Sequence, residues 1–273
     1  GGDDNDLGGD GKVNEADVDG AKYKVVWSCL LLVEQLLGDL AAAAHFQSLA
    51  NEVVGKVCEL LRLFNSRTQQ LVLGAGAIHS AAKLKSINAK HLALVSQSLG
   101  MVCGLLPHIR AALMAQLPRK QHSLLSDLDK IKQDIQAHAE KILAKFVSIV
   151  ASIVESSLVP QIMKTNFDVD GPSVAPPFLD GIYKNVAKLH QVLVALLPHD
   201  ELLDVFGRIF NYLDTKVPEL FQSAHDFSKS QAAKASKLKP SASNAQPPLF
   251  SLPQTEAGKE RMRAEVEGLA EKL

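Results

Sequence analysis

Apolar residues recur at steps of three and four positions over most of this chain, which is the period of helices packed on one side. In the first such segment, Leu30, Val33, Leu36, Leu37 and Leu40 share one face. We find no regular repeat and no convincing strand, so the pattern predicts an all-α fold. The predicted helices begin near Lys22 and then cover Phe46–Leu63, Gln69–Leu73, Asn88–Leu117, Arg119–Met163, Phe178–Leu197, Asp200–Phe227 and Glu256–Leu273.

Polar residues, glycines and prolines predict where these helices begin and end. Asn65 and the serine after it compete for backbone hydrogen bonds, so we expect an interruption there, and the glycines of Gly74–Gly76 favour a helix end. Asn88 is a good N-terminal cap. Pro107 should kink its helix or split it after the preceding leucine, and Pro118 marks the next boundary.

The longest predicted helix carries a heptad seam, because six of its residues step by four and three in alternation. Beyond the seam, the stripe shifts through Phe146, Ile149 and Ile153. A helix of some 40 residues would be roughly 60 Å long, which suggests an elongated bundle or rod. The seam comprises Leu124, Leu128, Ile131, Ile135, His138 and Ile142, of which Leu128, Ile131, Ile135 and Ile142 are the predicted structural core.

Composition along the chain predicts four parts. Residues 1–20 are rich in Gly and Asp and are expected to form a disordered acidic segment. Residues 21–227 carry the helical pattern and are the predicted helical-rod domain. Residues 228–254 are a Lys/Ser/Ala/Pro sequence expected to be a disordered linker, and residues 255–273 are a candidate short helix that is marginal alone.

Overall composition excludes several classes of protein. The apolar fraction is 47% with 5% aromatics, which favours helices, and the formal net charge of −1 argues against a dedicated nucleic-acid binder. Cys29, Cys58 and Cys103 lie in apolar runs and indicate buried, reduced thiols. The chain has no initiator Met and no signal-peptide pattern, so we expect a segment of a longer protein.

The most apolar stretch, Val25–Leu49, raises the question of a membrane span. It contains Glu34, Asp39 and His45, and charges at that spacing would be costly in lipid. We therefore predict a buried helix there.

No motif in the chain indicates catalysis, a cofactor or a metal. The glycines of Gly74–Gly76 lack the third glycine of a dinucleotide loop, since His79 stands in its place. Asp6, Asp10 and Asp17 match part of a Ca²⁺ loop, but Gly8 removes one ligand, and a disordered acidic tail is the favoured interpretation. The nine histidines are scattered, so no enzyme, cofactor or metal site is predicted.

Basic residues cluster near the paired glycines and again in the predicted linker. Around the glycines, Arg67, Lys83, Lys85 and Lys90 are the candidate contacts for a membrane or partner, because such a cluster can meet anionic lipid headgroups. A solvated helix face remains the alternative. In the linker, Lys229, Lys234, Lys237 and Lys239 run with no acid between them.

One region of the chain resembles a known family. The run Asn65–Ala77, followed by Leu84–Ile87 and His91–Leu94, is similar to the C-terminal portion of vacuolar protein sorting protein fifty-four, the largest subunit of GARP, the Golgi-associated retrograde protein tethering complex. Gln69 departs from the family, where a Cys is common, and Ala82-Lys83 stands where one Gly is expected. The resemblance covers roughly Val18–Leu213, with further matches at Val18–Tyr23, Ile109–Ala111 and Leu117–Gln121.

The resemblance implies a helical rod of the CATCHR type, the tether architecture shared with exocyst and COG subunits. It implies a role in tethering endosome-derived vesicles at the trans-Golgi network, as a peripheral protein on the cytosolic face of that membrane and of endosomes. The implied partners are the other GARP subunits, an endosomal lipid, and a small GTPase or adaptor, with SNAREs bound through parts outside this sequence. The alternative is a purely structural scaffold within the complex.

Overall fold

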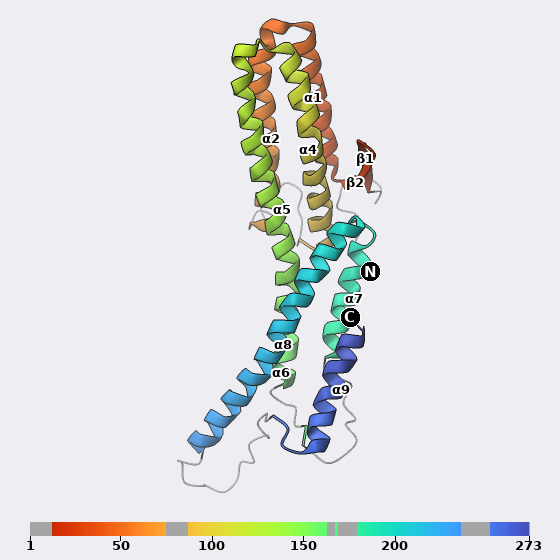
Figure 1. The fold of residues 1–273 in the computed structure, drawn as a ribbon, viewed down its shortest axis with the longest axis vertical. Helices are drawn as coiled ribbons and strands as arrows, with labels where there is room; N and C mark the ends of the chain where they lie inside the picture. Colours follow the sequence, from red (N-terminus) through yellow and green to blue (C-terminus); the bar gives the residue numbers. More distant parts are fainter. Residues whose placement is uncertain (1–12, 75–86, 163–166, 169–178, 236–251, 273) are drawn as a thin grey trace. The chain divides into compact units, whose positions relative to one another are not determined.

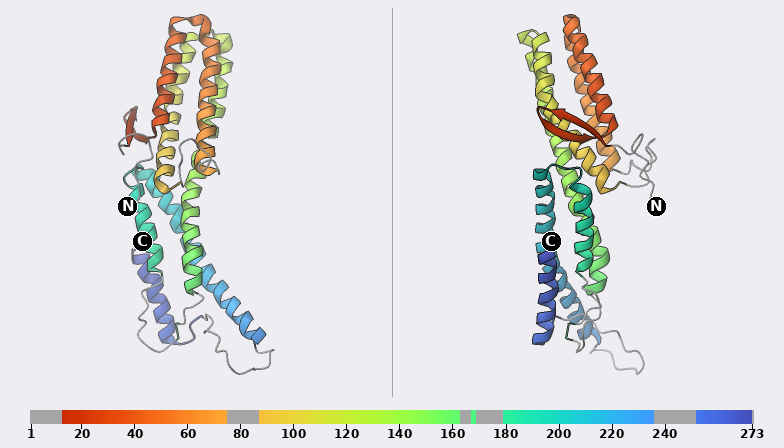
Figure 2. Two further views of the ribbon diagram at one scale, coloured as in Figure 1. Left: turned by 180° about the vertical axis from the view of Figure 1, so that it is seen from behind. Right: turned by 90° about the vertical axis from the view of Figure 1, so that its right-hand side faces the viewer.

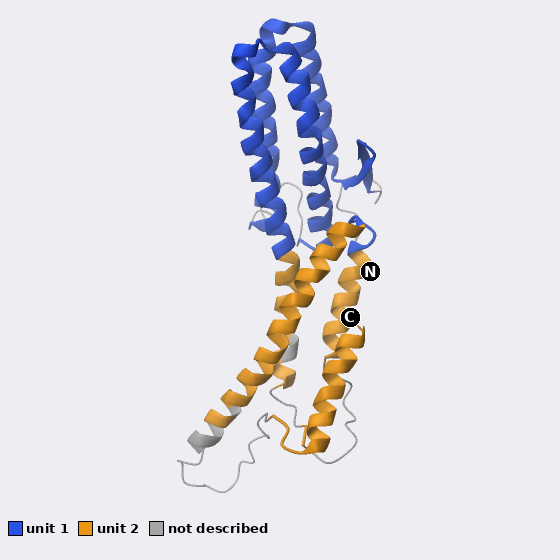
Figure 3. Ribbon diagram, viewed as in Figure 1, with its two compact units in different colours: residues 1–144, 193–198 blue, residues 145–192, 199–273 orange. Residues whose placement is uncertain are grey.

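The computed structural model describes residues 13–74, 87–162, 167–168, 179–235 and 252–272, and these are mostly helical (Figure 1). The predicted helical class is therefore confirmed for these residues, with one exception near the N-terminus. The chain divides into two compact units, residues 1–144 with 193–198 and residues 145–192 with 199–273 (Figure 3). The long helix α5 contributes residues to both units.

Unit 1 is a helical bundle in which α1, α2 and α4 contact one another pairwise. Its core consists mainly of aliphatic side chains, and Leu61, Leu99 and Leu113 are fully buried. A short 3₁₀ helix joins α1 to α2, and another follows α4. The elements are α1 (Trp27–His45), the 3₁₀ helix Gln47–Leu49, α2 (Ala50–Leu73), α4 (Ala89–Gln116), the 3₁₀ helix Arg119–Leu125 and α5 (Ser126–Ile153).

The prediction that no strand occurs is wrong, because β1 (Asn14–Val18) and β2 (Ala21–Val25) form an antiparallel hairpin. Its two-residue turn, Asp19-Gly20, has φ of 53° and 84°, as an Asp-Gly hairpin turn requires. The hairpin packs on α4 (Figure 2), where the missing Cβ of Gly100 leaves room for Tyr23. Residues 14–18, expected to be disordered, are thus a strand, and the first helix begins at Trp27 rather than near Lys22.

The predicted interruption at Asn65 does not occur, since α2 runs unbroken through it. The Asn65 side chain does not compete for the local backbone but bonds to His138 on α5. Thr68, one turn on, donates its hydroxyl to the Phe64 carbonyl at 2.6 Å, which an α-helix tolerates. The helix then ends at Leu73, before Gly74, as predicted.

Helix α4 begins as predicted and continues through its proline. The Asn88 side chain accepts from the backbone N–H of His91, whose ring accepts from the backbone N–H of Asn88, so the two close a capping box. Pro107 lies inside the helix without splitting it. The boundary predicted at Pro118 is confirmed, because α4 ends at Gln116.

The seam of α5 is mostly buried, although the start of the helix differs from the prediction. Leu124 is 45% exposed and belongs to the preceding 3₁₀ helix, where Leu125 is buried instead. Beyond Ile142 the buried residues are Phe146, Val150 and Val154, so the predicted shift onto Ile149 and Ile153 is wrong. The predicted core residues Leu128, Ile131, Ile135 and Ile142 are all at most 2% exposed.

Unit 2 contains the end of α5 and the C-terminal helices. Residues 228–235, expected in a disordered linker, continue α8, and Pro218 lies within that helix. Helix α9 is present where the short C-terminal helix is predicted. The elements after α5 are a π-helical turn (Val154–Leu158), α6 (Val159–Ile162), α7 (Asp180–Leu193), α8 (His199–Ala235) and α9 (Glu256–Lys272).

Polar contacts attach α9 to the rest of unit 2. Asp168 accepts hydrogen bonds from the backbone N–H groups of Gln254 and Thr255 and from the Thr255 hydroxyl, at 2.7–3.0 Å. These donors lower the pKa of the Asp168 carboxyl. At the other end of α9, Lys272 pairs with Asp180 of α7 at 2.9 Å. These contacts with distant residues attach α9 to unit 2, and the sequence of α9 alone does not predict them.

Candidate functional site

The structure describes two of the four basic residues predicted to contact a membrane or partner, Arg67 and Lys90. Arg67 is exposed on α2, where its Nη1 lies 3.5 Å from Oε1 of Gln70. Lys90 is half-buried in the first turn of α4. Lys83 and Lys85 lie outside the described residues. The described structure thus supplies two of the four positions, on two different helices.

The described part of the Asn65–Ala77 run, which carries the family resemblance, lies on α2 with some side chains buried in the bundle and others exposed. Asn65 and Thr68 are each 8% exposed and face the bundle, whereas Ser66 and Arg67 face outward. Two open surfaces of unit 1 flank this part of α2. One lies between α2 and α5, and the other lies between α1 and α2.

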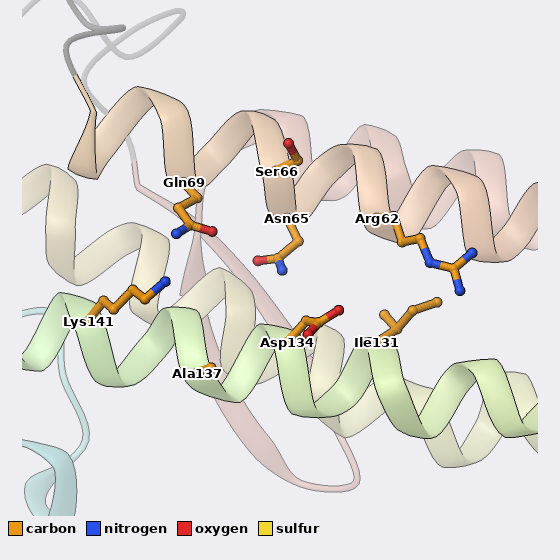
Figure 4. A pocket seen from close by; sticks show the side chains of 8 residues that line it. All are labelled: Arg62, Asn65, Ser66, Gln69, Ile131, Asp134, Ala137 and Lys141. Carbon is orange, nitrogen blue, oxygen red and sulfur yellow. The ribbon is translucent and has the colours of Figure 1, made fainter.

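The first surface, the α2–α5 polar pocket, has a volume of about 340 Å³ (Figure 4). Arg62 and Lys141 stand at its two ends with Asp134 between them. Arg62 is already engaged, because its Nη2 lies 2.7 Å from Oδ2 of Asp127 and lowers the pKa of that carboxyl. The pocket can offer hydrogen bonds to a polar ligand, but its side chains form no catalytic arrangement.

Asn65, which lines this pocket, forms a buried polar pair with His138. Nδ1 of His138 donates to Oδ1 of Asn65 at 2.8 Å, and His138 is 1% exposed. Burial, with a smaller contribution from nearby Lys141, lowers the pKa of His138 to about 4. Its Nε2 has no hydrogen-bond partner within the described residues. The neutral ring therefore joins α2 to α5 and is a structural element of the interface.

The cysteines do not provide a reactive site. All three are free thiols, with Cys29 and Cys58 buried and Cys103 half-buried. Burial raises the pKa of Cys29 to about 12 and also raises the pKa of the other two, so the nucleophilic thiolate is disfavoured. Within the described residues no group of three His, Cys, Asp or Glu side chains could hold a metal ion. Asp17, part of the Ca²⁺-loop match, lies in β1, while Asp6 and Asp10 lie outside the described residues.

The second surface, the α1–α2 outer groove, was missed by the sequence analysis. It has a volume of about 390 Å³ and a mainly apolar lining, which includes Leu31, Leu32 and Gln35 of α1 with Leu60, Leu63 and Arg67 of α2. Leu31 is 47% and Leu63 50% exposed. The available signal was the excess of leucines on α1, since Leu31 falls outside the stripe that packs inward.

The outward apolar face of α1 also corrects the prediction of a buried helix. Only Cys29, Leu32, Leu36 and Ala43 of α1 are buried. Among the described residues, three helical stretches are long and apolar enough to cross a membrane by length and composition alone, namely Trp27–His45, Ala89–Gln116 and Arg119–Ile162. Exposed Glu34 on α1 and the extensive burial of α4 inside the bundle both favour packing in protein.

Comparison with known proteins identifies the helices of unit 1. Residues 20–152 match the family model described as Vps54-like protein. The mouse protein named vacuolar protein sorting-associated protein 54 is 36% identical over 192 residues, which is 70% of this chain and 19% of the mouse protein. The chain belongs to the Vps54-like family.

Other relatives are likewise matched over only a small part of their own length. The Arabidopsis thaliana protein named vacuolar protein sorting-associated protein 54, chloroplastic, is 32% identical over 223 residues, covering 80% of this chain and 21% of the plant protein. The Schizosaccharomyces pombe protein of the same name is 31% identical over 176 residues, which is 62% of this chain and 17% of the yeast protein. The chain thus spans about a fifth of the length of these family members. No solved structure matches the chain.

Proposed function

We propose that this chain is a docking module of a GARP subunit, acting in retrograde transport from endosomes to the trans-Golgi network. The observation that carries the proposal is the family match across residues 20–152, which covers α1, α2, α4 and nearly all of α5. The module acts without catalysis as part of a CATCHR-type rod. It works on the cytosolic face of these membranes, with the other GARP subunits as partners.

The docking step of the proposal rests on the surface chemistry near the family-like motif. Arg67 is exposed on α2, and Lys83, Lys85 and Lys90 follow it in sequence. Cations near a membrane surface each contribute about 1 kcal/mol of attraction to anionic lipid. We propose that they contact an endosomal lipid or a membrane-bound small GTPase or adaptor.

Liposome co-flotation of the purified chain tests the lipid contact. The variant Lys83→Glu/Lys85→Glu/Lys90→Glu should lose most binding to phosphoinositide-containing vesicles. Its matched control, Lys229→Glu/Lys234→Glu/Lys237→Glu, makes the same charge change in the second basic cluster and should still bind. Equal flotation of wild type and both variants, or flotation of none, would remove the direct lipid contact from the proposal.

A cellular experiment separates docking from the alternative role as a scaffold, which the deep burial of the α5 seam favours. The three-lysine variant is introduced into the full-length protein in cells that lack it. Docking predicts normal recovery of the other GARP subunits by co-precipitation with slowed return of retrograde cargo. A scaffold predicts that assembly and transport are both unchanged.

A further inference from the structure

The α1–α2 outer groove leaves apolar side chains in water on a well-packed bundle. Leu31 and Leu63 of its lining are 47% and 50% exposed, while the opposite sides of α1 and α2 bury Leu36 and Leu61 almost completely. Exposed single apolar residues need no explanation, but a contiguous apolar groove marks an interaction surface. The exposed leucines do not contribute to the core of the bundle, so their position indicates a surface that binds a partner.

The spacing of the groove residues fits a helix as the occupant. On α1 the lining residues Leu31 and Gln35 are one turn apart, and on α2 Leu60, Leu63 and Arg67 follow at steps of three and four. Two neighbouring helices with such rows offer a groove into which the side-chain ridge of a third helix packs. The lined length, from Leu60 to Leu71 on α2, is roughly 16 Å, which suits about three helical turns.

The charge of Arg67 indicates which polar group the bound helix must carry. Arg67 is the one cation that lines the groove, and no carboxylate pairs with it among the described residues. Other arginines of the bundle do have carboxylate partners, such as Arg62 with Asp127 and Arg110 with Asp129. A carboxylate on the occupant would complete the same type of pair at Arg67.

The same charges disfavour an anionic membrane as the occupant of this surface. Helix α1 contains no Lys or Arg, and its charged residues are Glu34 and Asp39. Surfaces that bind anionic lipid through an apolar face surround it with cations. Of the basic cluster proposed to contact lipid, Arg67 also lines this groove, whereas Lys90 lies on α4 and does not line it.

We infer that the α1–α2 outer groove binds an amphipathic helix of another protein, which places apolar residues against Leu31 and Leu63 and a carboxylate against Arg67. This inference rests on the proposed role as a docking module and names the kind of protein partner. Gly38 lies on the same face of α1 as Leu31, and a Cβ there would meet nothing in the bundle, so the partner's backbone can approach closely.

Site-specific photocrosslinking in the full-length protein tests the inference in cells. Leu31→p-benzoylphenylalanine and Leu63→p-benzoylphenylalanine are the probes, and Glu52→p-benzoylphenylalanine, at an exposed site outside the groove, is the control. Mass spectrometry of the crosslinked peptides should identify one segment of another protein that is common to both probes. That segment should show apolar residues at helical spacing and a nearby Asp or Glu.

A charge swap then tests the pairing at Arg67. Arg67→Glu should weaken binding of the identified peptide by about tenfold, whereas Lys56→Glu, on α2 outside the groove, should leave it unchanged. Changing the peptide carboxylate to Lys should restore binding to Arg67→Glu. Crosslinks to lipid, to a second copy or another part of this chain, or to nothing, would overturn the inference, as would failure of the swap.

These outcomes are separable from those of the proposed function. If the three-lysine variant binds vesicles and supports transport normally, the proposed lipid contact fails while crosslinks at Leu31 and Leu63 still establish the groove. If the lysine variant loses flotation and the groove gives no crosslink, the docking module stands and the helix-binding groove is wrong.

Discussion

In unit 1 the helices meet through large apolar side chains, whereas α9 in unit 2 is attached mainly by hydrogen bonds and an ion pair at its two ends. Ile135 and Ile142 of α5 are fully buried, while within α9 itself only Gly258 and Leu269 are buried. Apolar burial of this kind stabilises a bundle over many contacts. The attachment of α9 depends on a few polar atoms, chiefly the Asp168 carboxylate.

The comparison teaches where each region is vulnerable. In the bundle, one polar side chain in place of a buried apolar residue of the seam should lower the stability of the whole unit. At α9, loss of one acceptor should release a single helix and leave the bundle intact. The following predictions test that difference, beginning with the largest expected effect.

Polar substitution in the seam should have the largest effect. Ile135→Gln should lower the free energy of unfolding by about 3–5 kcal/mol, because it loses apolar contacts and buries an amide without a partner. Leu128→Gln should act in the same way, since Leu128 is 2% exposed. Urea unfolding followed by circular dichroism measures both, with exposed Lys132→Gln as the control. Unchanged melting of both seam variants would show that the seam does not hold the bundle.

Acid should weaken the bundle through His138. The pKa of His138 is about 4 in the folded chain against 6.5 for a free histidine, so between these values the unfolded chain binds the extra proton. Stability should therefore fall as pH drops from about 6.5 to about 4, by about 1.4 kcal/mol per pH unit. Unfolding at several pH values measures the slope of the free energy of unfolding against pH. His138→Leu should reduce this slope by about 1.4 kcal/mol per pH unit. An identical slope in the variant would exclude His138 as the source.

Removal of the Asn65 amide should cost less than a seam substitution. Asn65→Ala leaves the buried Nδ1–H of His138 without an acceptor, which should lower the free energy of unfolding by about 1–3 kcal/mol. Ser66→Ala, at the exposed neighbouring position, is the matched control and should have little effect. A double-mutant cycle with His138→Leu should show strong coupling, and additive single effects would argue against the pair.

Loss of the Asp168 acceptor should have the smallest global effect. Asp168→Ala removes the partner of two backbone N–H groups and one hydroxyl at the start of α9. Hydrogen exchange should become faster in α9 and remain unchanged in α2 and α5. Glu260→Ala, an exposed change in the same helix, is the control. Faster exchange throughout the chain would mean that α9 supports more than its own attachment.

The features predictable from sequence were those set by periodicity and local capping. The steps between Leu128, Ile131 and Ile135 identify a buried stripe without knowledge of its neighbours, and the Asn88 cap depends on residues within one turn. Features that depend on distant partners were not predictable in this way. The side chain of Asn65 bonds to His138, 73 residues away, and the sequence around Asn65 gives no sign of that partner.

The hairpin and the outer groove were missed for two different reasons. The Asp19-Gly20 turn is a strong local signal, but the Gly- and Asp-rich composition of residues 1–20 predicts disorder for the segment that contains it. The groove has no motif, because Leu31 and Leu63 have the same residue type as core leucines and only burial distinguishes them. Candidate contacts inferred from sequence therefore favoured charged residues, and the apolar surface emerged only from the structure.

The central claim is that the buried faces of unit 1 hold the fold while its outer groove serves docking. The most direct test expresses full-length Leu31→Asp/Leu63→Asp in cells that lack the protein and measures the return of retrograde cargo, with the melting temperature of the purified chain measured alongside. The account predicts near-wild-type melting and defective transport. Full restoration of transport by this variant would contradict it.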